Sequence, residues 1–310
     1  ERAREALKRW MKTEDPTLES WLNLGTAHLF LKDEKDAEKA FKEALDKDKS
    51  NMVALEGLCE VYLIRDKEKD MLKTLERIEK LTPESRKLTY YKALAADRFK
   101  LKQYAENYFW DTLEEMVRSD SQDTKTLEVL CDAYINDQFL ERGILFLTEM
   151  QDLHGERSEY LFQLARIYTH TGDEDLARDL FRQVEDAGIK NLTPRQLVMM
   201  AQELFALEDD NLASEAYFSA ARKMDDNLAL EMFQDLRDLT TSDQRREFEL
   251  TPTGHKGIFL ITFWGRKDPT PTTIKNERLV EHYRRLRYVR KEYYSPLRPG
   301  YDERGRVYIK

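Results

Sequence analysis

A helix–turn–helix pattern of about 34 residues, repeated six times, limits the fold of this chain more than any other feature. In the first unit, Leu24, Ala27 and Leu31 lie three or four residues apart, so they share one stripe of a helix. Ala37 and Phe41 continue this spacing on a second helix. The units begin at residues 18, 52, 86, 124, 158 and 194. Because one hairpin cannot bury its own apolar face, the pattern predicts a mainly α-helical array of stacked hairpins.

The composition agrees with helices whose outer sides face water. Charged residues make up 36% of the 310 residues, with only 11 Gly and 8 Pro, which suits helices more than a sheet-rich fold. No apolar run approaches the roughly 18 residues of a membrane span, so we expect no span, while peripheral association with a membrane stays open. Cys59 and Cys131 occupy the same small-residue position of two repeats. We therefore expect both to be buried free thiols.

The residue types at fixed positions of the repeat carry a family resemblance. The marker residues of the first unit are Trp21, Leu24, Gly25 and His28, followed by Ala37, Phe41 and Ala44. Their offsets and the period resemble the tetratricopeptide repeat (TPR). The resemblance implies an α-solenoid, a right-handed superhelix whose first helices line a concave groove. It also implies that the groove binds a partner protein.

The same resemblance implies which side chains face the groove, namely those one residue after the Trp/Leu and the Gly/Ala/Cys positions. The predicted groove residues are Leu22, Thr26, Glu56, Glu60, Tyr90, Leu94, Glu128, Asp132, Phe162, Arg166, Val198 and Gln202. The middle of this set is acidic, which suits a basic or amphipathic segment of a partner. The alternative interpretation is that these charged residues only keep a helix face solvated.

The pattern divides the chain into four regions. Residues 1–17 resemble half of a preceding repeat, and residues 18–227 hold the six hairpins. Residues 228–251 are predicted to form a further helix that caps the last apolar face, since the end of a solenoid needs a cover. From residue 252 to residue 310 the composition changes and the repeat pattern is lost.

The last region is predicted to be a small α/β module. The stretch Gly257–Trp264 is β-branched and aromatic, which favours a buried strand. An amphipathic helix is expected from Asn276 to Tyr294, and a second strand from Gly305 to Ile309.

This C-terminal succession is similar to the GWxTD domain of bacterial proteins. The matching residues are Phe263, Trp264, Lys267, Asp268, Pro269, Thr270, Pro271, Asn276, Glu277, Arg304, Gly305, Arg306, Tyr308 and Ile309. At the namesake motif, Gly300-Tyr301-Asp302-Glu303 departs from the family pattern. The family continues past this point, so we expect an incomplete module. Its members commonly carry export signals and adjoin helical repeats, which favours the cell envelope or periplasm over the cytoplasm.

The charge is divided unevenly along the chain. Residues 252–310 hold 14 Lys/Arg against 6 Asp/Glu, although the whole chain has a net charge of −9. One basic face of the C-terminal helix carries Arg284, Arg287 and Lys291. These side chains could meet phosphates or nucleic acid. The favoured interpretation is that they pair with acidic residues of the array or of a partner protein, because the overall charge disfavours nucleic acid.

No catalytic or cofactor motif stands out in the sequence. The Gly-rich, P-loop, zinc-protease and nucleophile-elbow patterns are absent. His255 and His282, with Asp268 and Glu281, are the one cluster to test as an acid/base or metal site. We therefore predict a non-enzymatic scaffold or adaptor subunit of a larger complex, without metal or cofactor. The alternative is an enzyme or phosphate-binding protein whose activity lies in the basic C-terminal module.

Overall fold

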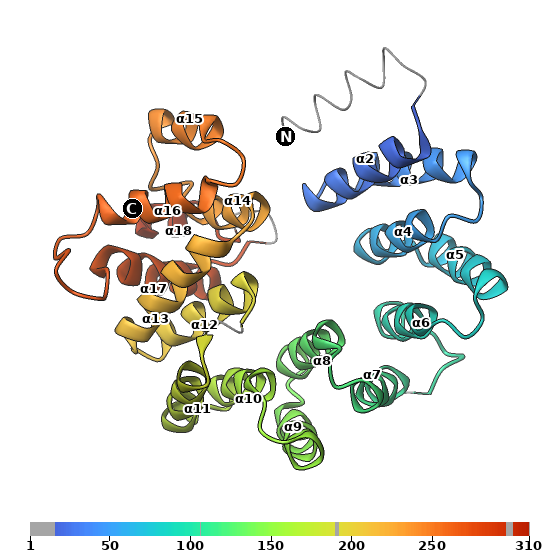
Figure 1. The fold of residues 1–310 in the computed structure, drawn as a ribbon, viewed down its shortest axis with the longest axis horizontal. Coiled ribbons are helices and arrows are strands. Elements are labelled where there is room, and N and C mark those ends of the chain that lie inside the picture. The colour runs from blue at the N-terminus through green and yellow to red at the C-terminus, as the bar shows by residue number, and fades with distance from the viewer. Residues whose placement is uncertain (1–15, 106, 190–191, 296–299, 310) are drawn as a thin grey trace. The chain divides into compact units, whose positions relative to one another are not determined.

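The computed structural model describes residues 16–105, 107–189, 192–295 and 300–309, and this part of the chain is mainly helical. Extended backbone pairs there only at an isolated bridge between Tyr294 and Tyr301. The chain divides into two compact units, residues 1–130 and 131–310 (Figure 1). The half repeat expected over residues 1–17 lies almost wholly outside the described residues. Within the described ranges, no helix combines the length and apolarity needed to cross a membrane.

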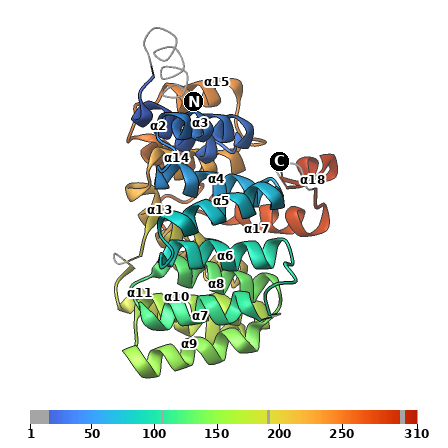
Figure 2. The same ribbon diagram turned by 90° about the vertical axis from the view of Figure 1, so that its right-hand side faces the viewer.

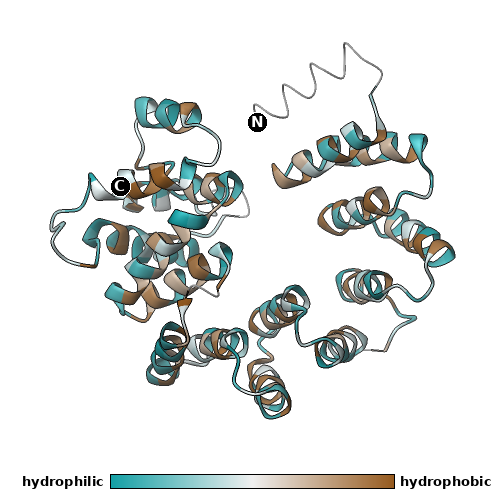
Figure 3. Cartoon of the chain, in the orientation of Figure 1, coloured by the Kyte–Doolittle hydropathy of each residue, from teal (hydrophilic) through white to brown (hydrophobic). Residues whose placement is uncertain are grey.

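Unit 1 is a succession of antiparallel helix pairs. Its helices are α2 (Leu18–Phe30), α3 (Glu34–Lys47), α4 (Met52–Ile64), α5 (Glu68–Leu81), α6 (Arg86–Arg98), α7 (Tyr108–Ser119) and the first half of α8 (Thr124–Asn136). Figure 2 shows α3 to α7 stacked in chain order. Most of these helices carry both hydrophobic and hydrophilic residues (Figure 3). In α3, α5 and α7 the buried side chains lie three or four residues apart, as the period of the sequence predicts.

A left-handed residue at the same position ends the first helix of each pair. In unit 1 these residues are Lys32, Asp66 and Lys100, with φ of 56°, 52° and 47°. They lie 34 residues apart, so the turn repeats with the sequence. The backbone N–H that follows donates back to the helix, as from Asp33 to the carbonyl of His28 at 2.9 Å. These turns reverse the chain and set the antiparallel pairing.

The side chain of Phe41 fills the space between the first two hairpins. Its ring is 2% exposed and lies between Gly25 of α2 and Gly57 of α4. A β-carbon built on Gly25 would lie 2.6 Å from Cε1 of Phe41. Gly25 therefore faces Phe41. The two glycines leave the room that the ring occupies.

Unit 2 continues the pairs and then departs from them. Its helices are the second half of α8, α9 (Leu140–His154), α10 (Ser158–Thr171), α11 (Glu174–Asp186), α12 (Pro194–Ala206), α13 (Asp210–Lys223), α14 (Asp226–Asp235), α15 (Ser242–Leu250), α16 (Lys256–Gly265), α17 (Glu277–Glu292) and α18 (Glu303–Ile309). The pair α12/α13 is the sixth hairpin. Cys59 in unit 1 and Cys131 in unit 2 are both buried and free, as expected.

Residues 228–251 form two helices, which corrects the expectation of a single capping helix. The second, α15, begins at a capping box formed by Thr241 and Gln244. The Thr241 hydroxyl accepts from the Gln244 N–H at 3.2 Å, and Gln244 Oε1 accepts from the Thr241 N–H at 3.0 Å. This reciprocal pair starts a new helix. The helices that pack against α13 from beyond the sixth hairpin are α16 and α17.

The two strands predicted for the C-terminal region are wrong, because both segments are helices. In α16, Phe259 and Phe263 lie four residues apart and are buried, whereas Ile258 and Thr262 are exposed. The sequence did not reveal this helical spacing, because nearly every residue of the run is apolar and its β-branched and aromatic residues favoured a strand. Packing supports the helix, since Gly257 lies so close to the carbonyl of Ala221 in α13 that no side chain would fit.

The second supposed strand is α18, which begins after a capping aspartate. Asp302 Oδ1 accepts from the backbone N–H of Arg304 at 2.9 Å and of Gly305 at 3.2 Å. An Asp that binds the first free N–H groups of a helix is an N-cap. The regular elements in the described part of the C-terminal region are therefore helices, apart from the single bridge between Tyr294 and Tyr301, and the region is not an α/β module.

Asn276 ties α16, α17 and α13 together at one buried point. It is 1% exposed. Its Nδ2 donates to the Trp264 carbonyl at 2.9 Å, and its Oδ1 accepts from the Leu279 N–H at 2.9 Å, which caps α17. Its own N–H donates to Ser214 Oγ at 3.3 Å. Nearby, Trp264 Nε1 donates to Tyr217 Oη of α13 at 3.1 Å. The C-terminal helices therefore continue the core of unit 2.

Candidate partner-binding surface

The first helices of unit 1 carry seven of the predicted groove residues, and we call this surface the first-helix face. It consists of Leu22 and Thr26 on α2, Glu56 and Glu60 on α4, Tyr90 and Leu94 on α6, and Glu128 on α8. In Figure 1, α4 and α6 lie on one side of unit 1 and α5 and α7 on the other. Thr26 is exposed and the other six side chains are partly exposed. The first-helix face is therefore accessible within unit 1.

Apolar side chains form the base of the first-helix face. Leu22, Tyr90 and Leu94 are partly buried and pack against the core of the first three hairpins. Burial, together with the nearby carboxylates of Glu60 and Asp123, raises the pKa of Tyr90 to about 12. The phenol is thus neutral at physiological pH and available as a hydrogen-bond donor.

Two carboxylates on the first-helix face lie near lysines of later hairpins. Lys87 Nζ lies 2.7 Å from Glu56 Oε2, and Lys125 Nζ lies 4.0 Å from Glu60 Oε1. Lys125 also lies 5.7 Å from the centre of the Tyr90 ring. The Glu60 side chain is 41% exposed, against 17% for Glu56. The face is therefore a network of both charges in which Glu60 is the more accessible carboxylate.

Two apolar residues next to the first-helix face were not among the predicted groove residues. Phe30 at the end of α2 is 39% exposed, and Ile64 at the end of α4 is 52% exposed. They lie 34 residues apart and so occupy the same repeat position. The sequence could have revealed these two residues, because a large apolar side chain recurs at this repeat position, outside the stripe of residues that form the core. Exposed apolar side chains at repeated positions are typical of a docking surface.

In unit 2 the predicted groove residues are less accessible. Phe162, Arg166 and Val198 are 0%, 7% and 5% exposed, and only Asp132 and Gln202 are partly exposed. Arg166 Nη2 donates to Asp132 Oδ1 at 2.6 Å. The arginine is therefore held inside the unit by its own chain, and the accessible part of the predicted surface lies mainly in unit 1.

The C-terminal basic face turns partly inward, toward α12 and α13. Arg284 donates to the Phe205 carbonyl at 3.2 Å and to Asp210 Oδ1 at 2.7 Å. Arg287 Nη1 lies 3.6 Å from Glu203 Oε2, while Lys291 is exposed. Two of the three predicted basic residues thus meet carboxylates of the sixth hairpin within the same unit.

The predicted histidine cluster is not assembled among the described residues. His282 is 3% exposed, whereas His255 is exposed, with its Nδ1 3.2 Å from the Thr253 carbonyl oxygen. The one grouping of three potential metal ligands in the described part of the chain is His28 with Asp33 and Asp36.

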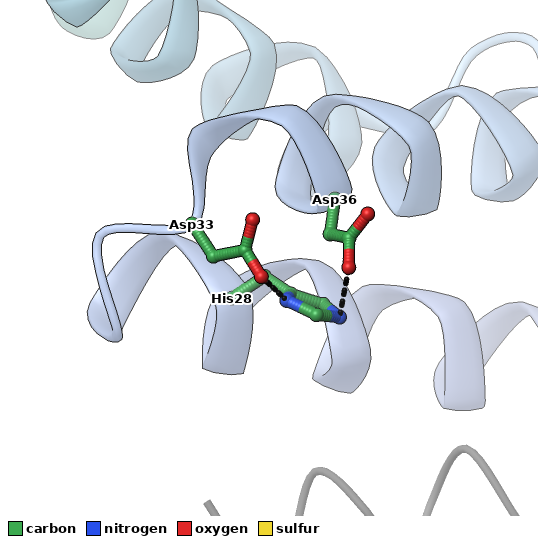
Figure 4. A group of neighbouring side chains, drawn as sticks. All are labelled: His28, Asp33 and Asp36. Atoms are coloured by element: carbon green, nitrogen blue, oxygen red, sulfur yellow. Dashed lines mark hydrogen bonds and ion pairs between the residues drawn. The ribbon is translucent and has the colours of Figure 1, made fainter.

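The His28 grouping has the geometry of an ion-pair network. Nδ1 lies 3.1 Å from Asp33 Oδ2, and Nε2 lies 3.9 Å from Asp36 Oδ2 (Figure 4). The two carboxylates lie at opposite nitrogens of the ring. The imidazole thereby links the turn of the first hairpin to the start of α3.

The repeats match a known family over part of the chain. The tetratricopeptide repeat model matches residues 18–51 and 158–187, which are the first and fifth hairpins of the structure. The protein is a helical-repeat protein that contains tetratricopeptide repeats. No curated protein sequence matches the chain.

Several solved structures are similar to the chain at low identity. A tetratricopeptide repeat protein from Parabacteroides merdae is 15% identical over 70% of this chain and 84% of its own, with a TM-score of 0.46. YrrB, described as a TPR protein with an unusual peptide-binding site, is 14% identical over 69% and 98%, with a TM-score of 0.35. Pseudomonas aeruginosa pilF is 14% identical over 64% and 88%, with a TM-score of 0.39.

Proposed function

We propose that the protein is a non-catalytic interaction scaffold that binds a segment of a partner protein on the first-helix face. TPR proteins generally mediate protein–protein interactions, and this chain contains such repeats. The observation that carries the proposal is the arrangement of the face itself. Leu22, Tyr90 and Leu94 form a half-exposed apolar base at repeated positions, and carboxylates lie beside them.

The chemistry of the first-helix face favours a partner segment with apolar and basic side chains. Phe30 and Ile64 extend the apolar base at one end of α2 and α4. Glu60 is the carboxylate best placed to meet a cation, because its own lysine partner lies at 4.0 Å and its side chain is 41% exposed. Several shallow apolar contacts supply affinity in such a surface, while the charges set register and orientation.

The proposal is tested by site-specific photocrosslinking in the full-length chain. A photoreactive amino acid at Thr26, which is exposed on the face, is expected to capture a discrete partner in cells. The same amino acid at Leu145 on α9, which is 73% exposed, serves as the control position. Equal capture at both positions, or none at Thr26, would contradict the proposal.

A charge-reversal pair provides the second arm of this test. Reversing Glu56 and Glu60 to lysine is expected to weaken Thr26 crosslinking at least tenfold, since interfacial charge pairs contribute about 1.4 kcal/mol or more. The matched control reverses Glu68 and Glu76, which are exposed on α5 of the same unit. If crosslinking at Thr26 is unchanged when Glu56 and Glu60 are reversed, or is weakened as much when Glu68 and Glu76 are reversed, the face does not select its partner by charge.

We further propose that this scaffold is a subunit of a bacterial assembly in the cell envelope. The support is the residue match of the C-terminal region to the GWxTD domain, in which Asn276 and Trp264 are among the matching residues. Those two residues form the buried junction of α16 and α17. Cell fractionation of the tagged native protein tests this assignment. Recovery in the cytoplasmic fraction, free of other subunits on a sizing column, would contradict it.

A further inference from the structure

A hollow of about 370 Å³ lies among the C-terminal helices of unit 2. Trp264 at the end of α16 and Ile309 at the end of α18 give it apolar walls. The N-terminal half of α17 supplies its polar side, through Arg278, Glu281 and the residues that follow them on the same helix face. The size falls within the usual range of small-molecule pockets.

The polar side of this C-terminal hollow carries a net positive charge. Three cations line it, namely Lys267, Arg278 and Arg285, against the one carboxylate of Glu281. Arg278 Nη1 donates to Glu281 Oε2 at 2.7 Å, and Arg285 Nη2 donates to Glu281 Oε1 at 2.5 Å. Glu281 thus holds two guanidinium groups side by side. Each guanidinium has further N–H groups to donate.

His282 lies at the buried side of the hollow with its polar atoms unsatisfied. It is 3% exposed, and neither ring nitrogen has a hydrogen-bond partner among the described residues. The backbone of Asp235 lies near the ring and acts to raise its pKa. Burial, together with Arg290 and Arg285, lowers the pKa of His282 to about 3, so the ring is neutral. Such unsatisfied buried groups are rare and destabilise the fold unless a ligand meets them.

We propose that this hollow binds the phosphate group of a small phosphorylated molecule, held by Arg278, Arg285 and Lys267 with an N–H of His282. Paired guanidinium groups fit the oxygens of a phosphate, and Lys267 adds a point charge. A phosphate alone would leave much of the hollow empty. The walls at Trp264 and Ile309 therefore receive the apolar or planar group attached to the phosphate.

The test measures binding to the full chain by calorimetry, with inorganic phosphate and phenyl phosphate as probes. Phenyl phosphate is expected to bind, and to bind more tightly than phosphate because of the apolar walls. The variant Arg278→Gln with Arg285→Gln is expected to weaken binding at least tenfold. The control variant Arg182→Gln, on an exposed arginine of α11 outside the hollow, is expected to change binding less than twofold.

Nuclear magnetic resonance of the His282 ring gives an independent readout. Phenyl phosphate is expected to shift the His282 ring signals, because the ring donates to the ligand, and to leave those of the exposed His255 unchanged. Arg278→Gln alone, at a side chain that is 60% exposed, keeps the test valid if the double variant does not fold. Failure of both probes to bind, or loss of binding in the Arg182 control, would overturn the proposal. Tighter binding of an oligonucleotide than of phenyl phosphate at the same arginines would overturn the small-molecule assignment.

Discussion

Replacing Gly57 with alanine tests whether the repeat stacking depends on the room left for one aromatic ring. A β-carbon at Gly57 would lie 2.6 Å from Cε2 of Phe41 and closer still to its Cζ. The ring lies between Gly57 and Gly25, so it could move away from an added β-carbon only toward the backbone of Gly25. Phe41 is also 2% exposed, so it has no route to solvent.

The expected effect is a net loss of stability. Overpacking a core with one methyl group costs about 1–3 kcal/mol. Replacing a glycine in a helix interior with alanine stabilises the fold by roughly 0.5–1 kcal/mol, because alanine loses less conformational entropy on folding. Gly57→Ala is therefore expected to lower the free energy of unfolding, by up to about 2.5 kcal/mol.

Urea denaturation followed by circular dichroism measures this change. In a Phe41→Leu background the clash is relieved, so Gly57→Ala should there be neutral or stabilising. The control is Gly265→Ala at the end of α16, where nothing lies within 4 Å of the added carbon, and it should not destabilise the protein. If Gly57→Ala stabilises the wild-type chain, or costs the same with leucine at position 41, the packing argument is wrong.

Two further predictions concern buried polar groups. Glu38, which is 6% exposed, accepts from Arg65 and from Lys67 at 2.9 Å. Burial raises its pKa, but hydrogen bonds from its lysine partners outweigh burial and lower the pKa below the usual 4.5. The ionised Glu38 therefore stabilises the fold above pH 4.5, and this stabilisation is lost as the pH falls below that value. Glu38→Gln should lower the free energy of unfolding by about 2 kcal/mol at pH 7. In urea titrations, the difference between the wild type and the variant should shrink at low pH. An unchanged difference at low pH would refute the ion-pair argument. Asn276→Ala removes the cap of α17 and the hydrogen bond to the Trp264 carbonyl. It should therefore lower the free energy of unfolding by about 2–3 kcal/mol and expose α17 to limited proteolysis. Unchanged protection of α17 would contradict the role of this junction.

The C-terminal region shows where local composition misleads. The apolar run Gly257–Trp264 contains enough β-branched and aromatic residues to favour a strand, and a run of this length does not separate the two structures. The environment decides, because α16 buries Phe259 and Phe263 against its neighbours and places Gly257 against the backbone of α13. The same contacts explain why α16 and α17 cover the sixth hairpin. The repeat pattern of the sequence did not predict which helices would cover it.

The sequence by itself determined the repeating part of the fold. A period of 34 residues, with small and aromatic residues such as Gly25 and Phe41 at fixed offsets, specifies hairpins that must stack, because each one alone leaves an apolar face in water. The tertiary structure alone decided which predicted surface residues stay accessible. Glu60 remains at the surface while Arg166 is buried against Asp132, since exposure depends on neighbours that are distant in the chain. The hollow beside His282 has the same origin, because it forms only where α16, α17 and α18 meet.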